Sequence, residues 1–222
     1  MGRERVNANP RKMPRQARSR ATVDAIITAA AHILIKRGYE GATTGRIAER
    51  AGVSIGSLYQ YFPNKEALVA ALIEGHANEI VSVIEAALDD PALATVADGI
   101  RALIKAGMVA HRIDPALHKI LNEQVPRVGR LAKAMDTSRR ITKAIERFLR
   151  AHADELDPGC DPAVAAVVVE TTVEALAHKA LAERRAMLTN GRLERETFRL
   201  ATRYLSPSWG AGAPTRARRL AH

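Results

Sequence analysis

Apolar residues recur at intervals of three and four along most of this chain, the spacing that places side chains on one face of an α-helix. The pattern predicts long helices over about residues 20–37, 65–88, 93–112, 127–155, 162–188 and 192–205. A shorter helix is expected from Asp114-Pro115 to just before Pro126, because aspartate caps helices and proline fits their first turn. Ala, Leu, Ile and Arg dominate, and aromatic residues make up only 4%, which favours helices over strands.

Residues 43–65 divide the helical pattern into two short helices joined by a tight turn. Thr44 is expected to cap the first and Ser54 the second, since a side-chain hydroxyl accepts from the unpaired N–H groups of a first turn. Gly52 suits a turn position with positive φ, and Ala48 allows two helix backbones to approach closely. This spacing is typical of a helix-turn-helix, whose second helix enters the major groove of DNA.

The outer face of the second short helix is rich in polar and aromatic groups. Their hydroxyl, amide and phenol functions can hydrogen-bond base edges or phosphates. The side chains in question are Ser57, Tyr59, Gln60 and Tyr61. A purely structural helix rarely places two tyrosines and a phenylalanine within four residues beside a proline, so we interpret this face as a DNA-contacting one.

From Thr43 to Lys65 the chain reads Thr-Thr-x-x-Ile-Ala-x-x-Ala-Gly-Val-Ser-x-Gly-x-Leu-Tyr-x-Tyr-Phe-x-x-Lys, which resembles the DNA-binding signature of the TetR family of transcriptional regulators. The resemblance implies phosphate contacts by Thr44, Tyr59, Tyr61 and Lys65. It implies that Ser54, Gly56, Ser57 and Gln60 face bases. The complete predicted DNA-binding set is Thr43, Thr44, Arg46, Ser54, Ile55, Gly56, Ser57, Tyr59, Gln60, Tyr61 and Lys65. Gly45 departs from family members with a long base-reading side chain, so readout from the first helix passes to Arg46 or is absent.

Helix count and resemblance together predict an all-α protein of about nine helices. An N-terminal three-helix DNA-binding head with the helix-turn-helix would be followed by a C-terminal helical body for ligand binding and dimerisation. The predicted segments are a basic flexible arm at 1–19, the helix-turn-helix domain at 20–64, a long linking helix at 65–88, the regulatory and dimerisation domain at 89–205, and a disordered basic tail at 206–222.

The net charge of +10 lies mainly at the two ends of the chain. Residues 1–20 hold seven basic groups against one acidic group, and residues 206–222 hold three basic groups. The part between is therefore nearly neutral, so bulk charge does not identify the DNA-binding face. The N-terminal arm either attracts phosphates or enters a neighbouring minor groove, or it is a solvated tail that aids solubility.

Helix-turn-helix proteins usually bind palindromic operators in double-stranded DNA as twofold dimers. The resemblance places the homodimer interface on the helices at 162–188 and 192–205. Apolar residues on more than one face of the first of these support it, although a central position in the body would explain them too. The resemblance also implies an unknown small-molecule effector that releases a repressor from its operator. The alternative is a dimeric DNA-binding regulator without an effector.

Polar and apolar residues on the body helices are candidates for lining an effector pocket. They are Met108, His111, His118, Leu121, Ile145, Phe148, Glu174 and His178. Alternatively, the histidines are satisfied core or interface groups and Glu174 lies on a solvated stripe. Glu174 and His178 have the i, i+4 spacing of a zinc pair, but no third ligand is identifiable, so no metal is expected.

Enzymatic activity is not expected, because the sequence holds no nucleophile–base pair, glycine-rich phosphate loop or HExxH-like element. No cofactor is expected either. The one cysteine, Cys160, excludes an internal disulfide and suits a reducing cytosol. No stretch resembles a signal peptide or a membrane span, since the most apolar run, Ala163 to Val169, ends at Glu170. A cytoplasmic protein with no membrane partner is predicted.

Overall fold

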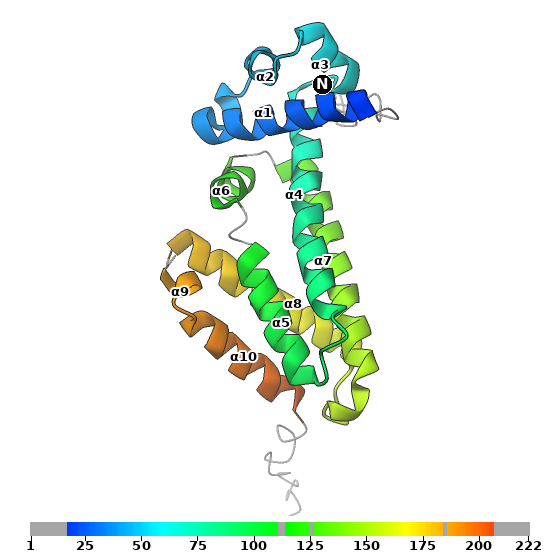
Figure 1. Ribbon diagram of the computed structural model, residues 1–222. Helices are drawn as coiled ribbons and strands as arrows, with labels where there is room; N and C mark the ends of the chain where they lie inside the picture. Colours follow the sequence, from blue (N-terminus) through cyan, green and yellow to red (C-terminus); the bar gives the residue numbers. More distant parts are fainter. Residues whose placement is uncertain (1–16, 111–113, 125–126, 184–185, 207–222) are drawn as a thin grey trace, which may run out of the picture. The chain divides into compact units, whose positions relative to one another are not determined.

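The computed structural model describes residues 17–110, 114–124, 127–183 and 186–206, and within these ranges the chain is helical and has no strand (Figure 1). The helices are α1 (Ala17–Gly41), α2 (Thr44–Ala51), α3 (Ile55–Tyr61), α4 (Lys65–Leu88), α5 (Val96–Ala110), α6 (Pro115–Glu123), α7 (Arg127–Ala151), the 3-10 turn η1 (Ala153–Glu155), α8 (Pro162–Glu183), α9 (Ala186–Thr189) and α10 (Arg192–Leu205). The predicted all-α fold is confirmed. Where the sequence predicted one helix over 162–188, the structure has α8 followed by the four-residue α9, which was not among the nine expected helices.

The helix predicted over 127–155 is shorter than expected, because α7 ends at Ala151. His152 has non-helical backbone angles, and its ring nitrogen Nδ1 lies 3.0 Å from the carbonyl oxygen of Phe148. A carbonyl only accepts, so the imidazole donates here and satisfies one of the carbonyls that a helix end leaves without a backbone partner. The chain then continues into η1.

The chain folds as two compact units. Unit 1 comprises the described residues of 1–81 and 111–138, and unit 2 comprises those of 82–110 and 139–222. The helix α6 and the first part of α7 therefore belong to the same unit as α1, α2 and α3. The predicted boundaries between arm, head, linking helix, body and tail stay a prediction, and both charged ends of the chain lie almost wholly outside the described residues.

The core of unit 1 gathers apolar side chains from α1, α2, α3, α4 and α6. Its largest fully buried members are Ile26, Leu34, Ile47, Leu58, Leu68 and Phe62. Leu117 and Leu121 of α6 belong to the same cluster. Burying one such side chain is worth about 1.5–3 kcal/mol, so apolar packing holds α6 against the helices that precede it.

The helix-turn-helix begins with a cap one residue earlier than predicted. Thr43, not Thr44, is the N-cap of α2, since its backbone is extended and its hydroxyl accepts from the N–H of Arg46 at 3.4 Å. Gly52 ends α2 with φ of 67°, as the sequence predicted, and its N–H donates to carbonyls of α2. Ser54 caps α3 by accepting from the N–H of Ser57 at 3.0 Å, which confirms the second cap.

The core of unit 2 forms where α5, α7, α8 and α10 meet. Its largest fully buried side chains are Ile100, Leu103, Ile104, Ile145, Leu149 and Leu205. Gly99 of α5 lies directly under the ring of Phe148 from α7, so close that a Cβ on this glycine would stand 2.0 Å from the ring. The absence of a side chain at residue 99 therefore sets how closely these two helices approach.

Among the described helices, α4 is long and apolar enough to cross a membrane on length and composition alone, with a mean hydropathy of 1.4 over its most apolar window. The sequence prediction that no segment qualifies does not hold for this helix. Core helices of soluble proteins meet the same criterion, and α4 supplies Leu68, Val69 and Leu72 to the core of unit 1.

Candidate nucleic-acid interface

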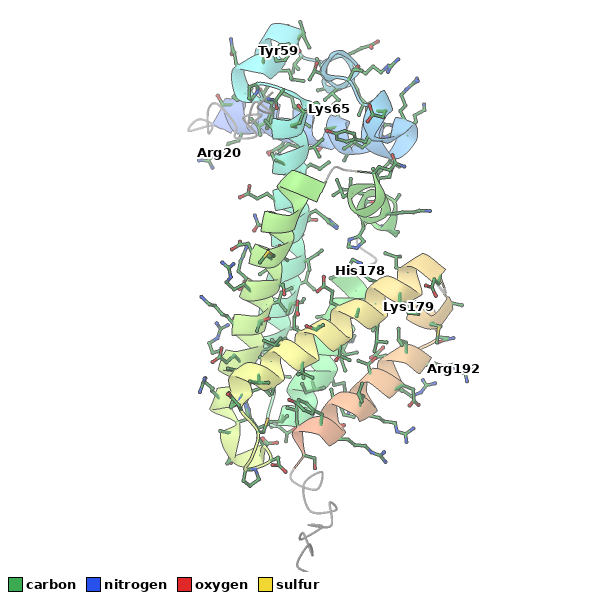
Figure 2. All side chains as sticks on the ribbon, turned by 180° about the vertical axis from the view of Figure 1, so that it is seen from behind. Arg20, Tyr59, Lys65, His178, Lys179 and Arg192 are labelled. Atoms are coloured by element: carbon green, nitrogen blue, oxygen red, sulfur yellow. The ribbon has the colours of Figure 1, made fainter. Side chains whose placement is uncertain are left out.

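The short helix α3 buries one face and exposes the other. Leu58 is completely buried in the core of unit 1, whereas Ile55 and Tyr59 are 44% and 41% exposed. Gln60 is exposed as well, and Figure 2 shows Tyr59 on the surface of α3. Ile55, Tyr59 and Gln60 are thus accessible, and the buried Leu58 anchors the helix.

Hydroxyl groups join the two helices of the helix-turn-helix. Oγ1 of Thr44 lies 3.0 Å from the phenol oxygen of Tyr59, and either group can donate. Ser54 and Ser57 are joined in the same way, with their hydroxyl oxygens 2.9 Å apart. Tyr61 differs from these residues, because it is half-buried and packs against the core of unit 1. The structure therefore brings Thr44 and Tyr59 together, and their contact with phosphates stays a prediction.

The two cations predicted to contact DNA both bind the end of α1. Nη1 of Arg46 donates to the carbonyl oxygen of Gly41 at 2.9 Å. Nζ of Lys65 donates to the carbonyl oxygen of Tyr39 at 3.1 Å and lies 4.0 Å from the centroid of its ring, a cation–π contact. The sequence pattern did not identify Tyr39 as a partner of either cation, although it lies just after the helix predicted over residues 20–37.

The residues predicted to line an effector pocket are divided between the two units. Met108, Ile145 and Phe148 are buried in unit 2. His118 and Leu121 are buried in unit 1, where Leu121 belongs to the core cluster. Glu174 and His178 are on α8 and also belong to unit 2, whereas His111 lies outside the described residues. Whether these side chains line a pocket stays a prediction.

The predicted pair on α8 forms a weak contact near the surface. Nε2 of His178 lies 3.8 Å from Oε1 of Glu174, and 38% and 53% of their side chains are exposed (Figure 2 labels His178). In the described parts of the chain, no three His, Cys, Asp or Glu side chains lie close enough together to hold a metal ion.

A histidine pair that sequence reasoning missed joins α4 to α6 within unit 1. Nε2 of His76 lies 3.2 Å from Nδ1 of His118, with the rings arranged edge to face. Burial lowers the pKa of His76 below its ordinary 6.5, although the carboxylates of Glu79 and Asp114 act in the opposite direction. The signal in the sequence was the row Leu68, Leu72, His76, in which a polar residue continues an apolar stripe at intervals of four.

This histidine pair predicts that unit 1 loses stability in mild acid. Below pH 6.5 the unfolded chain protonates His76 more readily than the folded chain does, so the free energy of unfolding falls as pH drops from about 6.5 toward the lowered pKa. Above that range this residue contributes no pH dependence. Chemical denaturation between pH 5 and 8 should show the decline, and His76→Gln should make it shallower. If stability declined with falling pH as steeply in His76→Gln as in the wild type, His76 would not be the source of the decline. Part of the decline is expected to remain in the variant, since burial also lowers the pKa of His178.

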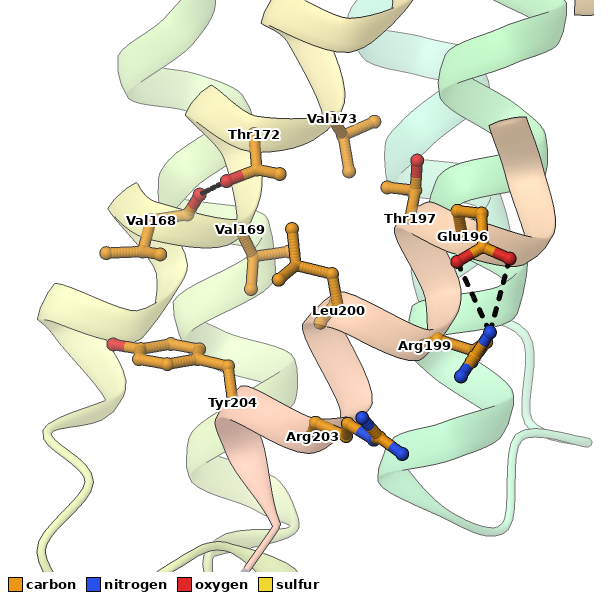
Figure 3. A pocket seen from close by; sticks show the side chains of 11 residues that line it. Val168, Val169, Thr172, Val173, Glu196, Thr197, Arg199, Leu200, Arg203 and Tyr204 are labelled. Atoms are coloured by element: carbon orange, nitrogen blue, oxygen red, sulfur yellow. Dashed lines mark hydrogen bonds and ion pairs between the residues drawn. The ribbon is translucent and has the colours of Figure 1, made fainter. Parts of the chain in front are cut away.

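The helices α8 and α10 of unit 2 enclose an apolar surface groove of about 450 Å³ (Figure 3). It is lined by Val168, Val169, Thr172, Val173, Glu196, Thr197, Arg199, Leu200, Ala201, Arg203 and Tyr204. Figure 3 shows Leu200 pointing between the two helices, with Glu196 and Arg199 paired at the rim, 3.3 Å apart. Val164 and Val167 extend the apolar surface along α8 and are 55% and 51% exposed. The single chain thus leaves a valine-rich face open to solvent.

Comparisons with known proteins agree with the helix-turn-helix and extend to the rest of the chain. The family model described as bacterial regulatory proteins, tetR family, matches residues 26–72, and the tetracyclin repressor-like C-terminal domain matches residues 95–205. The uncharacterized HTH-type transcriptional regulator YvkB of Bacillus subtilis is 41% identical over 66 residues, which is 30% of this chain and 35% of YvkB. The chain thus matches about a third of the length of such curated relatives.

Solved structures share the fold over nearly the whole chain. SmeT, the repressor of the Stenotrophomonas maltophilia multidrug efflux pump SmeDEF, is 24% identical, with a TM-score of 0.66 over 91% of this chain and 99% of SmeT. FadR of Bacillus subtilis, in complex with stearoyl-CoA, is 19% identical, with a TM-score of 0.66 over 82% of this chain and 98% of FadR. Two family models that together cover both the head and the body show that this chain belongs to the TetR family of transcriptional regulators.

Proposed function

We propose that the protein is a homodimeric repressor that binds a palindromic operator in double-stranded DNA and is released from it by a small-molecule effector. The observation that carries the proposal is the exposed outer face of α3, where Tyr59 and Gln60 stand on a helix anchored by the buried Leu58. Because its target is DNA, we place the protein in the cytoplasm, with neither a membrane partner nor a cofactor.

The DNA contacts follow from the chemistry of this face. Gln60 offers an amide that can hydrogen-bond an adenine edge, and the hydroxyls of Thr44 and Tyr59, 3.0 Å apart, can bind one phosphate together. Lys65 lies at the N-terminus of α4, where the helix dipole adds positive potential. Base contacts set the sequence preference, and phosphate contacts set most of the affinity.

The valine-rich face on α8 and the groove beside it support the homodimer. Val164 and Val167, together with Leu200 on α10, expose large apolar side chains on adjoining helices. Contiguous apolar surface of this kind is costly to leave in water. Pairing α8 and α10 with the same helices of a second copy would bury it in a four-helix bundle, with the polar rim of Glu196 and Arg199 at its edge.

The effector is proposed from the family and from the relatives' ligands, of which stearoyl-CoA in FadR is one. An effector that binds the DNA-competent and DNA-incompetent shapes equally would shift nothing, so it must prefer the second. A tenfold loss of operator affinity requires about 1.4 kcal/mol of such coupling. The second candidate is a dimeric DNA-binding regulator without an effector.

Substitutions on α3 test the DNA-binding proposal. Gln60→Ala is expected to lower affinity for the DNA upstream of the protein's own gene by about tenfold or more, since a bidentate base contact is worth roughly 1–3 kcal/mol. Affinity for a scrambled duplex of equal length should not change. Tyr59→Phe, which keeps the ring but loses the hydroxyl paired with Thr44, should weaken binding to both duplexes alike.

Fluorescence anisotropy at fixed salt measures both affinities, and thermal unfolding of each variant checks that the head is intact. Equal binding of the operator by wild type, Gln60→Ala and Tyr59→Phe would refute the assignment of α3 as the DNA-contacting helix.

A further inference from the structure

Gln124, the C-cap residue that follows α6, accepts a hydrogen bond from the backbone of α1. Its side-chain Oε1 accepts from the N–H of Tyr39 at 3.1 Å, although the two residues are 85 positions apart in the sequence. Both belong to unit 1, where Leu117 and Leu121 already pack α6 into the shared core. Gln124 falls within the segment predicted as the regulatory and dimerisation domain, residues 89–205, whereas its side chain contacts α1 of unit 1.

The end of α1 is shaped to receive this side chain. Gly38 has φ of 70° and ψ of 177°, a conformation that is essentially restricted to glycine. A Cβ on Gly38 would stand 2.7 Å from Oε1 of Gln124. The glycine thus turns the chain at the end of α1 and leaves room for the carboxamide beside the N–H of Tyr39. The contact depends on two features of this segment, its backbone conformation and its missing side chain.

Tyr39 of α1 also binds the side chain of Lys65. The carbonyl oxygen of Tyr39 accepts from Nζ of Lys65 at 3.1 Å, and the ring of Tyr39 lies under the ammonium group at 4.0 Å. Tyr39 is only 8% exposed, so its ring is fixed by its surroundings. Gln124 therefore binds one side of the Tyr39 residue and Lys65 binds the other, within a single part of unit 1.

We propose that Gln124 is a positioning residue for operator binding, which acts through Tyr39 to hold Lys65 where it meets a DNA phosphate. The inference rests on the proposed function. An ammonium group has three donors, and the Tyr39 carbonyl takes one of them, so Lys65 can be held by α1 and donate to a phosphate at the same time. Gln124 orders the acceptor, and Lys65 then binds DNA without a further loss of side-chain freedom.

The bond between Gln124 and Tyr39 makes the position of α6 matter for DNA binding, because Gln124 follows the last residue of α6. A displacement of α6 by about one ångström would stretch the 3.1 Å bond to Tyr39 beyond hydrogen-bonding distance. The N–H of Tyr39 would then lose its acceptor, and the carbonyl that binds the Lys65 ammonium would be held less firmly. The bond thus gives α6 a direct effect on a phosphate contact, in addition to any movement of α4.

A double-mutant cycle tests the inference. Gln124→Met keeps the length of the side chain and removes the acceptor, and Lys65→Met removes the charge. Operator affinity should fall about 3- to 10-fold in Gln124→Met, the range of a typical hydrogen bond. Lys65→Met should also lower affinity, and the slope of log K against log salt should shrink by about 0.9, the contribution of one phosphate contact. In the Lys65→Met background, Gln124→Met should have no further effect.

Two further measurements separate failure of this inference from failure of the proposed function. Amide hydrogen exchange at Tyr39 without DNA should be faster in Gln124→Met, and Ala116→Ser, on the exposed side of α6, should change neither exchange nor affinity. Additive effects of the two methionine substitutions, or unchanged affinity in Gln124→Met, would overturn the positioning role while leaving the DNA-binding proposal intact. A wild-type chain that does not bind its upstream DNA would overturn both.

Discussion

Replacing Leu200 with glutamate is expected to give a folded monomer that binds operator DNA at least about a hundredfold more weakly than the wild-type protein. Leu200 is 56% exposed in the single chain and lines the groove between α8 and α10. In a dimer built on these helices the new carboxylate would be buried in an apolar interface, which costs several kcal/mol per subunit. A monomer meets only one half-site and loses the contacts of the other.

Light scattering after size-exclusion chromatography measures the mass, and anisotropy measures the affinity for operator DNA. Met135→Glu is a matched control, because Met135 on α7 is 55% exposed and lies outside the proposed interface. This variant should remain dimeric. A dimeric Leu200→Glu protein with unchanged operator affinity would exclude α8 and α10 as the interface, whereas monomers in both variants would point to a general loss of association.

The helix-turn-helix was predictable from the sequence because its signals are local. A cap, a glycine with positive φ and a buried aliphatic residue follow one another within 15 residues, and each has a physical reason to occupy its position. The error at the first cap was one residue, since both Thr43 and Thr44 have a hydroxyl and only the backbone angles distinguish them. Long helices such as α4 were equally predictable, because an apolar stripe repeats many times along them.

Contacts between distant helices were not predictable, because periodicity says which face is buried and not what it meets. The bond between Tyr39 and Gln124 joins residues from different helices, and nothing in either segment specifies the other. The histidines 76 and 118 likewise form a pair only once α4 and α6 are placed side by side. The candidate effector residues were chosen by composition, which does not distinguish a pocket wall from a core. Phe148 is an example, because it was predicted to line a pocket and is buried against Gly99. Substitutions at these two positions can measure how tightly its ring is packed.

Gly99→Ala is expected to destabilise unit 2 by about 1–3 kcal/mol, the usual cost of overpacking a well-filled core. The added methyl would stand 2.0 Å from Cζ and 2.2 Å from Cε1 of Phe148. The ring is 7% exposed and has the ring of His152 4.4 Å from its centroid, so it cannot simply turn away. Chemical denaturation followed by circular dichroism gives the free energy of unfolding.

Shortening the ring should relieve the clash, so the double variant Gly99→Ala/Phe148→Leu should be less destabilised than the sum of its two single variants. Gly75→Ala is the control: a Cβ there meets nothing within 4 Å, and replacing a glycine within α4 should raise stability by about 0.5–1 kcal/mol. Strict additivity at Gly99 and Phe148 would mean that the ring has room to move, as the wall of an adaptable effector pocket requires. A double variant that is more stable than the sum of its single variants predicts would instead identify Phe148 as the side chain that fixes the spacing of α5 and α7. An effector would then have to be bound by other residues of the body.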